Sequence, residues 1–150
     1  QHLVLRRQRQ MCIRDRFESG GGGLVATARD YLRFSQMMLN GGELDGVRIL
    51  SPKTVQLMTA NHIGDLPMGF GRTGAGFGLD FGVVLDPGAV GEVSSAGEYN
   101  WGGAAGTRFW IDPQEKLVGL FMVQSIPHRT RLAGDFKVLA YQAMTESYSD

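Results

Sequence analysis

Cysteine is almost absent from this chain, which has one thiol, at Cys12, among 150 residues. A single thiol excludes an internal disulfide and a thiolate metal cluster. The histidines do not provide a metal site either, because His2, His62 and His128 lack the spacing of metal ligands. We therefore expect each histidine to be a surface or loop residue, and we expect no bound metal.

Long apolar runs and an excess of charge are also lacking. No run approaches the roughly 20 residues of a membrane-spanning helix. The 15 basic residues balance the 15 acidic ones, so the net charge of zero gives no electrostatic reason to expect nucleic acid or an anionic membrane as partner. The glycine patterns of nucleotide-binding loops and the G-x-S-x-G nucleophile elbow are missing as well. A nucleotide-binding fold is therefore disfavoured.

The balanced charge hides a basic N-terminal segment. Residues 1–16 contain five arginines and one aspartate, which leaves ten basic and fourteen acidic residues in the remainder, a net charge of −4. This segment could be a basic arm or part of a targeting peptide, although it lacks the small-residue cleavage site of a secretory signal. Residues 10–16 resemble translated sequencing-adaptor sequence. We therefore expect residues 1–16 to be non-native or disordered, and residues 17–150 to hold the folded part.

Three segments have the signals of helices. Thr27 with Asp30 three residues later forms a capping box that begins the first helix, and Asn40 with two glycines ends it. The apolar face predicted for this helix comprises Tyr31, Leu32, Ser35, Met38 and Leu39. Ser51 with a following proline begins a second, short helix. Residues 129–146 are predicted to form a terminal helix. Its apolar side comprises Leu132, Phe136, Leu139, Ala140 and Ala143.

The middle of the chain has the patterns of strands. Alternating apolar residues predict one half-buried strand over residues 77–85. Residues 108–111 and 117–123 predict a hairpin around a short turn. The second arm is apolar on both faces, so we expect a central strand that is covered above and below. Two helices, three antiparallel strands and a terminal helix predict an α+β fold, with helices flanking an antiparallel sheet.

The acidic residues indicate no functional site by their spacing. Nothing in the sequence pairs Asp80, Asp86 or Glu98, so turn and solvent-facing roles are predicted for them. The segment from Tyr99 through Trp101 to two glycines leads toward an apolar, strand-like run. Small residues there would leave a bare backbone edge, on which a substrate can lie against main-chain N–H and C=O groups. A packing tryptophan beside a glycine bulge is the alternative interpretation.

Four stretches carry a resemblance to a known family, in the family's order. They read GGLVATARDYLRF at residues 22–34, LDGVRILSP at 44–52, YNWGG at 99–103 and TRFWIDP at 107–113. Together they resemble the C-terminal half of the serine β-lactamase-related hydrolases, close to class C β-lactamases and family VIII esterases. The resemblance implies a partial β-lactamase/transpeptidase-like fold over residues 17–150. It also implies acyl-serine hydrolysis of a small ester, amide or peptide substrate without a cofactor.

The resemblance also implies roles for single residues. Trp101, Gly102 and Gly103 occupy the three places of the family's third motif, often Lys-Thr-Gly, on the strand edge that faces the nucleophile. These three residues and Tyr99 are thereby identified as substrate-binding. Ala104 matches the position whose backbone N–H joins the oxyanion hole. Trp101 replaces the lysine, which weakens the case for recognition of a β-lactam carboxylate. It favours the esterase branch, with an apolar wall suited to acyl or alcohol groups.

The nucleophile and the general base of this family are not in the sequence. There is no S-x-x-K, because Thr54 stands three residues after Ser51, and no Y-x-N, because Trp101 stands two residues after Tyr99. We expect both motifs upstream, in the missing N-terminal half of the domain, which is the partner that this chain needs.

Two alternatives stay open. A non-catalytic binding or scaffold protein with the same fold would lack both motifs in the upstream reading frame. A standalone glycine-rich domain that binds carbohydrate would be a stable monomer, whereas a fragment would expose apolar surface on its sheet.

We predict that the isolated 150-residue chain does not hydrolyse esters, because it has no activated serine. The measurement is release of p-nitrophenol from the acetyl and butyryl esters. A reproducible burst that a serine-directed phosphonate abolishes would contradict the prediction.

Overall fold

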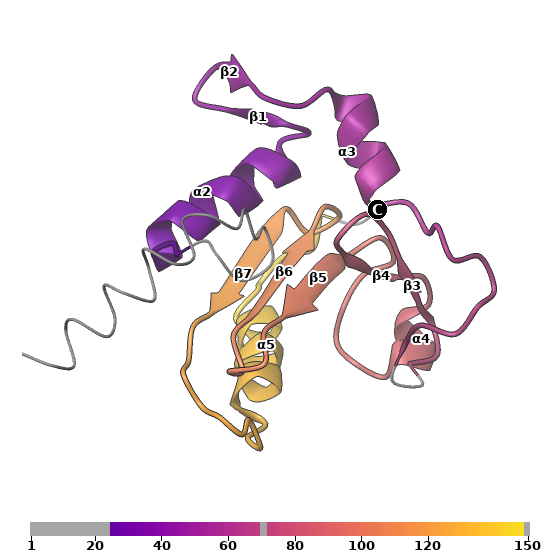
Figure 1. The fold of residues 1–150 in the computed structure, drawn as a ribbon, viewed down its shortest axis with the longest axis vertical. Helices are drawn as coiled ribbons and strands as arrows, with labels where there is room; N and C mark the ends of the chain where they lie inside the picture. Colours follow the sequence, from indigo (N-terminus) through magenta and orange to yellow (C-terminus); the bar gives the residue numbers. More distant parts are fainter. Residues whose placement is uncertain (1–24, 70–71, 149–150) are drawn as a thin grey trace, which may run out of the picture.

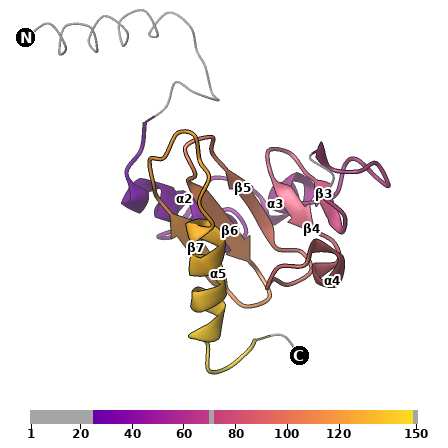
Figure 2. The same cartoon turned by 90° about the horizontal axis from the view of Figure 1, so that it is seen from below.

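The computed structural model describes residues 25–69 and 72–148, and the predicted non-native segment 1–16 lies outside them. The elements are α2 (Ala28–Leu39), β1 (Glu43–Leu44), β2 (Val47–Arg48), α3 (Pro52–Met58), β3 (Ala75–Phe77), β4 (Gly82–Val84), α4 (Pro87–Val90), β5 (Tyr99–Gly102), β6 (Arg108–Asp112), β7 (Leu117–Phe121) and α5 (Leu132–Gln142). In these ranges the main sheet has five antiparallel strands in the order β3-β4-β5-β6-β7. Helices α2 and α5 cover opposite faces of it (Figures 1 and 2). The predicted α+β class is therefore confirmed.

None of the helices in the described ranges has both the length and the apolar character to cross a lipid bilayer.

The predicted ends of the first two helices are confirmed. Thr27 Oγ1 accepts a hydrogen bond from the Asp30 N–H at 3.2 Å, and the Thr27 N–H donates to Asp30 Oδ2 at 3.1 Å. Helix α2 ends at Asn40, after which Gly42 has φ +96°. A Cβ on Gly42 would lie 2.2 Å from the carbonyl oxygen of Leu50, so the turn requires glycine. Ser51 caps α3 through the backbone N–H of its third residue.

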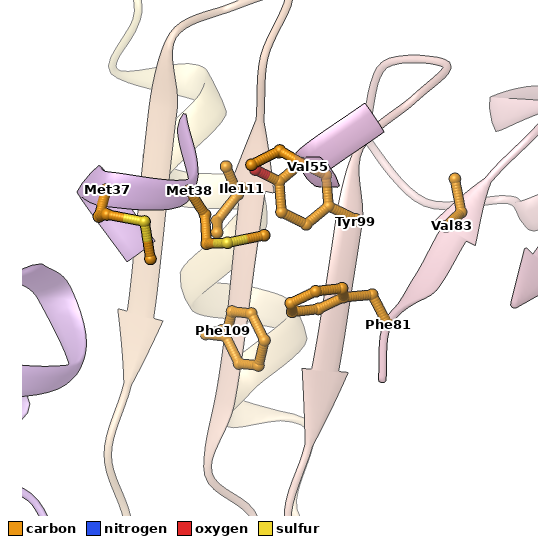
Figure 3. Packing of buried hydrophobic residues seen from close by; sticks show 8 residues of the cluster. All are labelled: Met37, Met38, Val55, Phe81, Val83, Tyr99, Phe109 and Ile111. Atoms are coloured by element: carbon orange, nitrogen blue, oxygen red, sulfur yellow. The ribbon is translucent and has the colours of Figure 1, made fainter. Parts of the chain in front are cut away.

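One hydrophobic core lies between α2, α3 and the sheet (Figure 3). Its buried members are Met37, Met38, Val55, Phe81, Val83, Tyr99, Phe109 and Ile111. The rings of Phe81 and Tyr99 meet edge to face, with their centroids 5.3 Å apart. The predicted apolar face of α2 is only partly the buried one: Ser35 and Met38 are buried, but Leu32 is 44% exposed. This core holds β4 and β5 against the helices.

The single strand predicted over residues 77–85 is wrong. The structure has two short strands there, β3 and β4, which pair with each other across a tight bend. Asp80 has φ +71° in that bend, and the Gly78 N–H donates to the Phe81 carbonyl at 2.8 Å. The glycines of the alternation mark close contacts rather than exposure to solvent. A Cβ on Gly78 would lie 2.2 Å from the Met58 carbonyl oxygen, and Gly82 is buried in β4. The turn role predicted for Asp80 is confirmed, and Asp86 caps α4.

The predicted positions of the last strand and helix also need correction. Strand β7 is not central, because it is the last strand of the sheet in the described ranges, although α2 and α5 cover it on both faces as expected. The sequence pattern predicts three strands and does not resolve β5 as a strand of its own. Helix α5 is shorter than predicted and buries Ala133 and Lys137, whereas Leu132 and Leu139 are 53% and 63% exposed.

We predict that Gly119→Ala destabilises the fold by about 1–3 kcal/mol, because a Cβ there would overpack the contact between the sheet and α5, where Trp110 meets Phe136. That Cβ would lie 2.1 Å from Cζ2 of the fully buried Trp110. Urea unfolding measures the change. The matched control is Gly134→Ala on α5, where a Cβ meets nothing within 4 Å. It should stabilise by up to about 1 kcal/mol through helix propensity. Equal effects of the two substitutions would contradict the packing argument.

Candidate active site

Among residues 25–69 and 72–148, no strand pairs with the outer edge of β5 at its C-terminal end. Strand β5 pairs with β6 along its whole length, but with β4 only at Tyr99 and Asn100. In an antiparallel strand the backbone groups alternate between the two neighbours. The Glu98 carbonyl accepts from the Val84 N–H at 2.8 Å, so the main-chain groups of Gly102 face the same side, beyond the end of β4. The bare edge expected from the sequence is therefore present at Gly102.

A tight turn follows β5 and holds Ala104 at its tip. The Gly103 N–H donates to the Thr107 carbonyl at 2.8 Å, and the Gly106 N–H donates to the Gly103 carbonyl at 2.9 Å. A Cβ on Gly103 would lie 2.5 Å from Thr107 Oγ1, which explains the glycine. Ala104 is exposed, and in the described part of the chain its N–H makes no hydrogen bond. This N–H is therefore free to donate to a ligand.

The segment after β7 contacts this turn through Ser125 and His128. The Ser125 N–H donates to the Ala105 carbonyl at 2.9 Å. The imidazole of His128 packs against Gly106, where a Cβ would lie 2.1 Å from Nδ1. His128, predicted as a surface or loop residue, is thus a half-buried support of the turn. His62 bonds through Nε2 to the Leu57 carbonyl at 2.7 Å, and no cluster in the described ranges has the ligands for a metal ion.

The structure brings four of the five predicted site residues to one exposed edge. Trp101 is 41% exposed, and its ring lies edge-on to Phe77 with centroids 5.2 Å apart. Gly102, Gly103 and Ala104 follow it and are exposed as well. Tyr99 is not brought to this surface, because its side chain is 2% exposed within the core. It anchors the buried half of β5.

The solvent-facing role predicted for Glu98 is wrong. Glu98 is fully buried, accepts a hydrogen bond from Lys137 Nζ at 2.7 Å, and lies 3.0 Å from the Tyr141 hydroxyl. The same hydroxyl donates to Asp112 Oδ2 at 2.7 Å. Burial raises the pKa of Glu98, and the charge of Lys137 partly offsets this. The cluster ties α5 to the residue that precedes β5, so it positions the strand that carries the exposed edge.

A charged cavity of about 620 Å³ borders the other face of this edge. Gly102 and Gly103 line it together with Glu92, Arg108 and Lys137. Arg108 Nη2 lies 2.5 Å from Glu92 Oε2, and Lys137 Nζ lies 3.9 Å from the same atom. Burial alone would raise the pKa of Glu92, but the hydrogen bond and charge of Arg108 and the charge of Lys137 hold it below its usual value. The cations of this face are thus neutralised in part by the protein's own carboxylates.

We predict that Lys137→Met destabilises the fold by about 3–5 kcal/mol, because it leaves Glu98 buried without its cation. Folding raises the pKa of Glu98 above 4.5, so this carboxyl favours the folded state most at low pH and less as the pH rises through the raised value. The deficit of the variant should therefore grow with increasing pH in urea titrations.

Two controls accompany that measurement. The double variant Glu98→Gln/Lys137→Met removes both charges and should recover much of the loss. Arg33→Met breaks an exposed pair with Asp45, whose side chains are 54% and 66% exposed. It should cost less than about 1 kcal/mol. A pH-independent deficit in Lys137→Met would contradict the assignment.

Comparisons with known proteins show the family of the chain. A family model described as Beta-lactamase matches residues 3–142. The match begins inside segment 1–16, whose non-native origin stays a prediction. An uncharacterized protein of Mycobacterium tuberculosis is 40% identical over 123 residues, which are 74% of this chain and 30% of the relative. A provisionally named D-alanyl-D-alanine carboxypeptidase of Escherichia coli O157:H7 is 29% identical over 73% of this chain and 24% of its own length.

A solved structure has a similar fold. EstCE1, a hydrolase with promiscuous acyltransferase activity, superposes with a TM-score of 0.68 and 26% identity over 82% of this chain and 32% of its own. The chain thus spans about a third or less of the length of these proteins. Because the family model covers nearly all of its residues, the chain belongs to the beta-lactamase family.

Proposed function

We propose that this chain is the C-terminal part of a serine hydrolase that cleaves esters or amides through an acyl-serine intermediate. The observation that carries the proposal is the free N–H of Ala104, exposed beside the unpaired edge of β5. Family membership and the likeness to EstCE1, a hydrolase with acyltransferase activity, support the same chemistry.

The main-chain groups at the edge define the proposed roles. The Ala104 N–H donates to the oxyanion that forms when a serine attacks the substrate carbonyl, which is worth roughly 3–4 kcal/mol in the transition state. The N–H and C=O of Gly102 bind the substrate backbone, and Gly103 lets the substrate approach closely. Trp101 forms an apolar wall where the related motif often has lysine. An uncharged ester or amide therefore fits this edge better than an anionic β-lactam.

The catalytic serine has to come from outside these residues, because the sequence contains no S-x-x-K and no Y-x-N. The outer edge of β7, which has no strand partner in the described part of the chain, supports the need for a further part of the domain. An apolar cavity of about 420 Å³ runs along this strand, lined by Leu32 of α2, by Val118 and Leu120, and by Phe136 of α5. We propose that the missing N-terminal half packs there and brings the nucleophile to β5. If the upstream reading frame of the gene contained neither S-x-x-K nor Y-x-N, a non-catalytic binding or scaffold protein would be favoured instead.

We predict that Ala104→Pro in the full-length parent lowers kcat by about 10²–10³-fold with little change in KM, because proline removes the oxyanion donor. Proline is compatible with the second position of the turn that Ala104 occupies. Steady-state hydrolysis of p-nitrophenyl butyrate measures the effect.

The matched control keeps the donor. Ala104→Gly retains the N–H and should stay within a few-fold of the parent enzyme. If Ala104→Pro were as active as Ala104→Gly, the proposed oxyanion role would be wrong.

A further inference from the structure

Two buried carboxyl groups meet at one tyrosine hydroxyl between α5 and the sheet. The hydroxyl oxygen of Tyr141 lies 2.7 Å from Asp112 Oδ2 and 3.0 Å from Glu98 Oε2. Both acidic side chains are fully buried. Glu98 directly precedes β5 and Asp112 is the last residue of β6, so this hydroxyl joins the helix to two neighbouring strands. Buried oxygens of this kind are stable only when each has a hydrogen-bond partner.

The donors around these carboxyl groups are one proton short. Glu98 Oε1 accepts from Lys137 Nζ at 2.7 Å and from Asn100 Nδ2 at 3.3 Å. Asp112 Oδ1 accepts from two backbone N–H groups of the following turn, at 3.0 and 3.2 Å. The other two oxygens, Oε2 and Oδ2, share the single proton of the Tyr141 hydroxyl. In the described part of the chain no further donor reaches either of them.

A proton on Glu98 would complete this set of hydrogen bonds. The Tyr141 hydroxyl donates to Asp112, the nearer carboxylate, so its lone pairs face Glu98 Oε2. Burial and the hydrogen bond to Asp112 raise the pKa of Tyr141, so the phenol keeps its own proton. Two oxygens without a hydrogen between them repel each other, whereas a protonated Oε2 donates to the phenol. The added proton also leaves the buried cluster neutral, with one ammonium and one carboxylate.

The groups that face Glu98 decide at which pH this proton leaves. Burial has the largest effect and raises the pKa of Glu98 above 4.5. Lys137 on α5 favours the ionised form, and the negative charge of Asp112 on β6 favours the neutral acid. A cavity of about 270 Å³ borders Glu98 and brings in three more charged residues, Arg72, Glu92 and Arg108. Two of these, Glu92 and Arg108, form an ion pair with each other.

We propose that Glu98, Tyr141 and Asp112 form a proton-dependent link between α5 and the sheet. With a proton on Glu98, hydrogen bonds run without a break from Glu98 through Tyr141 to Asp112. When that proton passes to solvent, Glu98 keeps its ion pair with Lys137, but Tyr141 can then donate to only one of the two carboxylates. The link is therefore complete at low pH and weaker at high pH. It concerns the support of β5 and does not rest on the hydrolase function proposed above.

Titration of Glu98 in a tyrosine variant tests the direction of the hydrogen bond. In the chain labelled with ¹³C at the glutamate side-chain carboxyl groups, NMR follows the ionisation of Glu98, and Glu98→Gln identifies its signal. Tyr141→Phe removes the oxygen that accepts the Glu98 proton, so the midpoint of the titration should fall by about one pH unit. If Tyr141 instead donates to an ionised Glu98, the same variant raises the midpoint, and the proposal is wrong.

The matched control is Tyr148→Phe. Tyr148 is 62% exposed, and its ring lies over Lys116 Nζ, a contact that phenylalanine keeps. This substitution should leave the Glu98 midpoint unchanged. A midpoint at or below pH 4.5 in the parent chain would also overturn the proposal, because the buried acid would then hold its proton no better than an exposed one.

A second variant decides the question even if Tyr141→Phe does not fold. Glu98→Gln replaces the neutral acid with an amide whose N–H can donate to Tyr141 at every pH. The raised pKa of Glu98 stabilises the folded parent most at low pH, and this contribution is lost as the pH rises through the raised value. The parent should therefore lose stability to urea relative to Glu98→Gln over that range.

Hydrogen exchange shows where the parent loosens. The amide protons of α5 should exchange faster in the parent than in Glu98→Gln above the midpoint of Glu98, and equally fast below it. A difference between the two proteins that stays constant at every pH would contradict the proton-dependent link.

Discussion

The ion pair between Glu98 and Lys137 joins two parts of the chain that are far apart in sequence. Lys137 lies on α5 and Glu98 directly precedes β5, yet their charged atoms are 2.7 Å apart and both side chains are buried. A buried carboxylate and a buried ammonium each lose hydration, which only close pairing and further hydrogen bonds offset. The side-chain amide of Asn100 adds such a bond, from Nδ2 to Glu98 Oε1 at 3.3 Å. The position of β5, and with it the edge at Gly102, depends on this contact and on the core on the opposite face.

The two faces of β5 thus have different kinds of support. Tyr99 packs in the apolar core under α2, while Asn100 faces the polar side and lies 3.3 Å from Glu98 Oε1. Beyond Asn100 the strand loses its partner β4, and after Trp101 the chain continues in small residues. A rigid strand that ends in an unpaired edge suits a site in which backbone N–H groups bind a reacting carbonyl, because the donors are oriented before the substrate arrives.

Local signals predicted the parts of the fold that depend on neighbouring residues. Three such features were predicted correctly, because each involves residues only a few positions apart. They are the capping box at Thr27 and Asp30, the Ser51 cap, and the hairpin of β6 and β7. The strand predicted over 77–85 was wrong because glycines can stand in a bend as well as on an open strand face. The role of Glu98 could not be predicted from local sequence, because its partner Lys137 lies 39 residues further along the chain.

The sequence by itself determined the α+β class, the helix caps and the segment from Trp101 to Ala104 as the candidate edge, since residue type and spacing act locally there. Only the tertiary structure decided that β4 begins opposite Asn100, so that it pairs with nothing beyond it, and that Tyr99 is buried away from the edge. It also placed the loop at Leu66 beside Trp101. These features depend on contacts between residues distant along the chain, which packing and strand pairing select together.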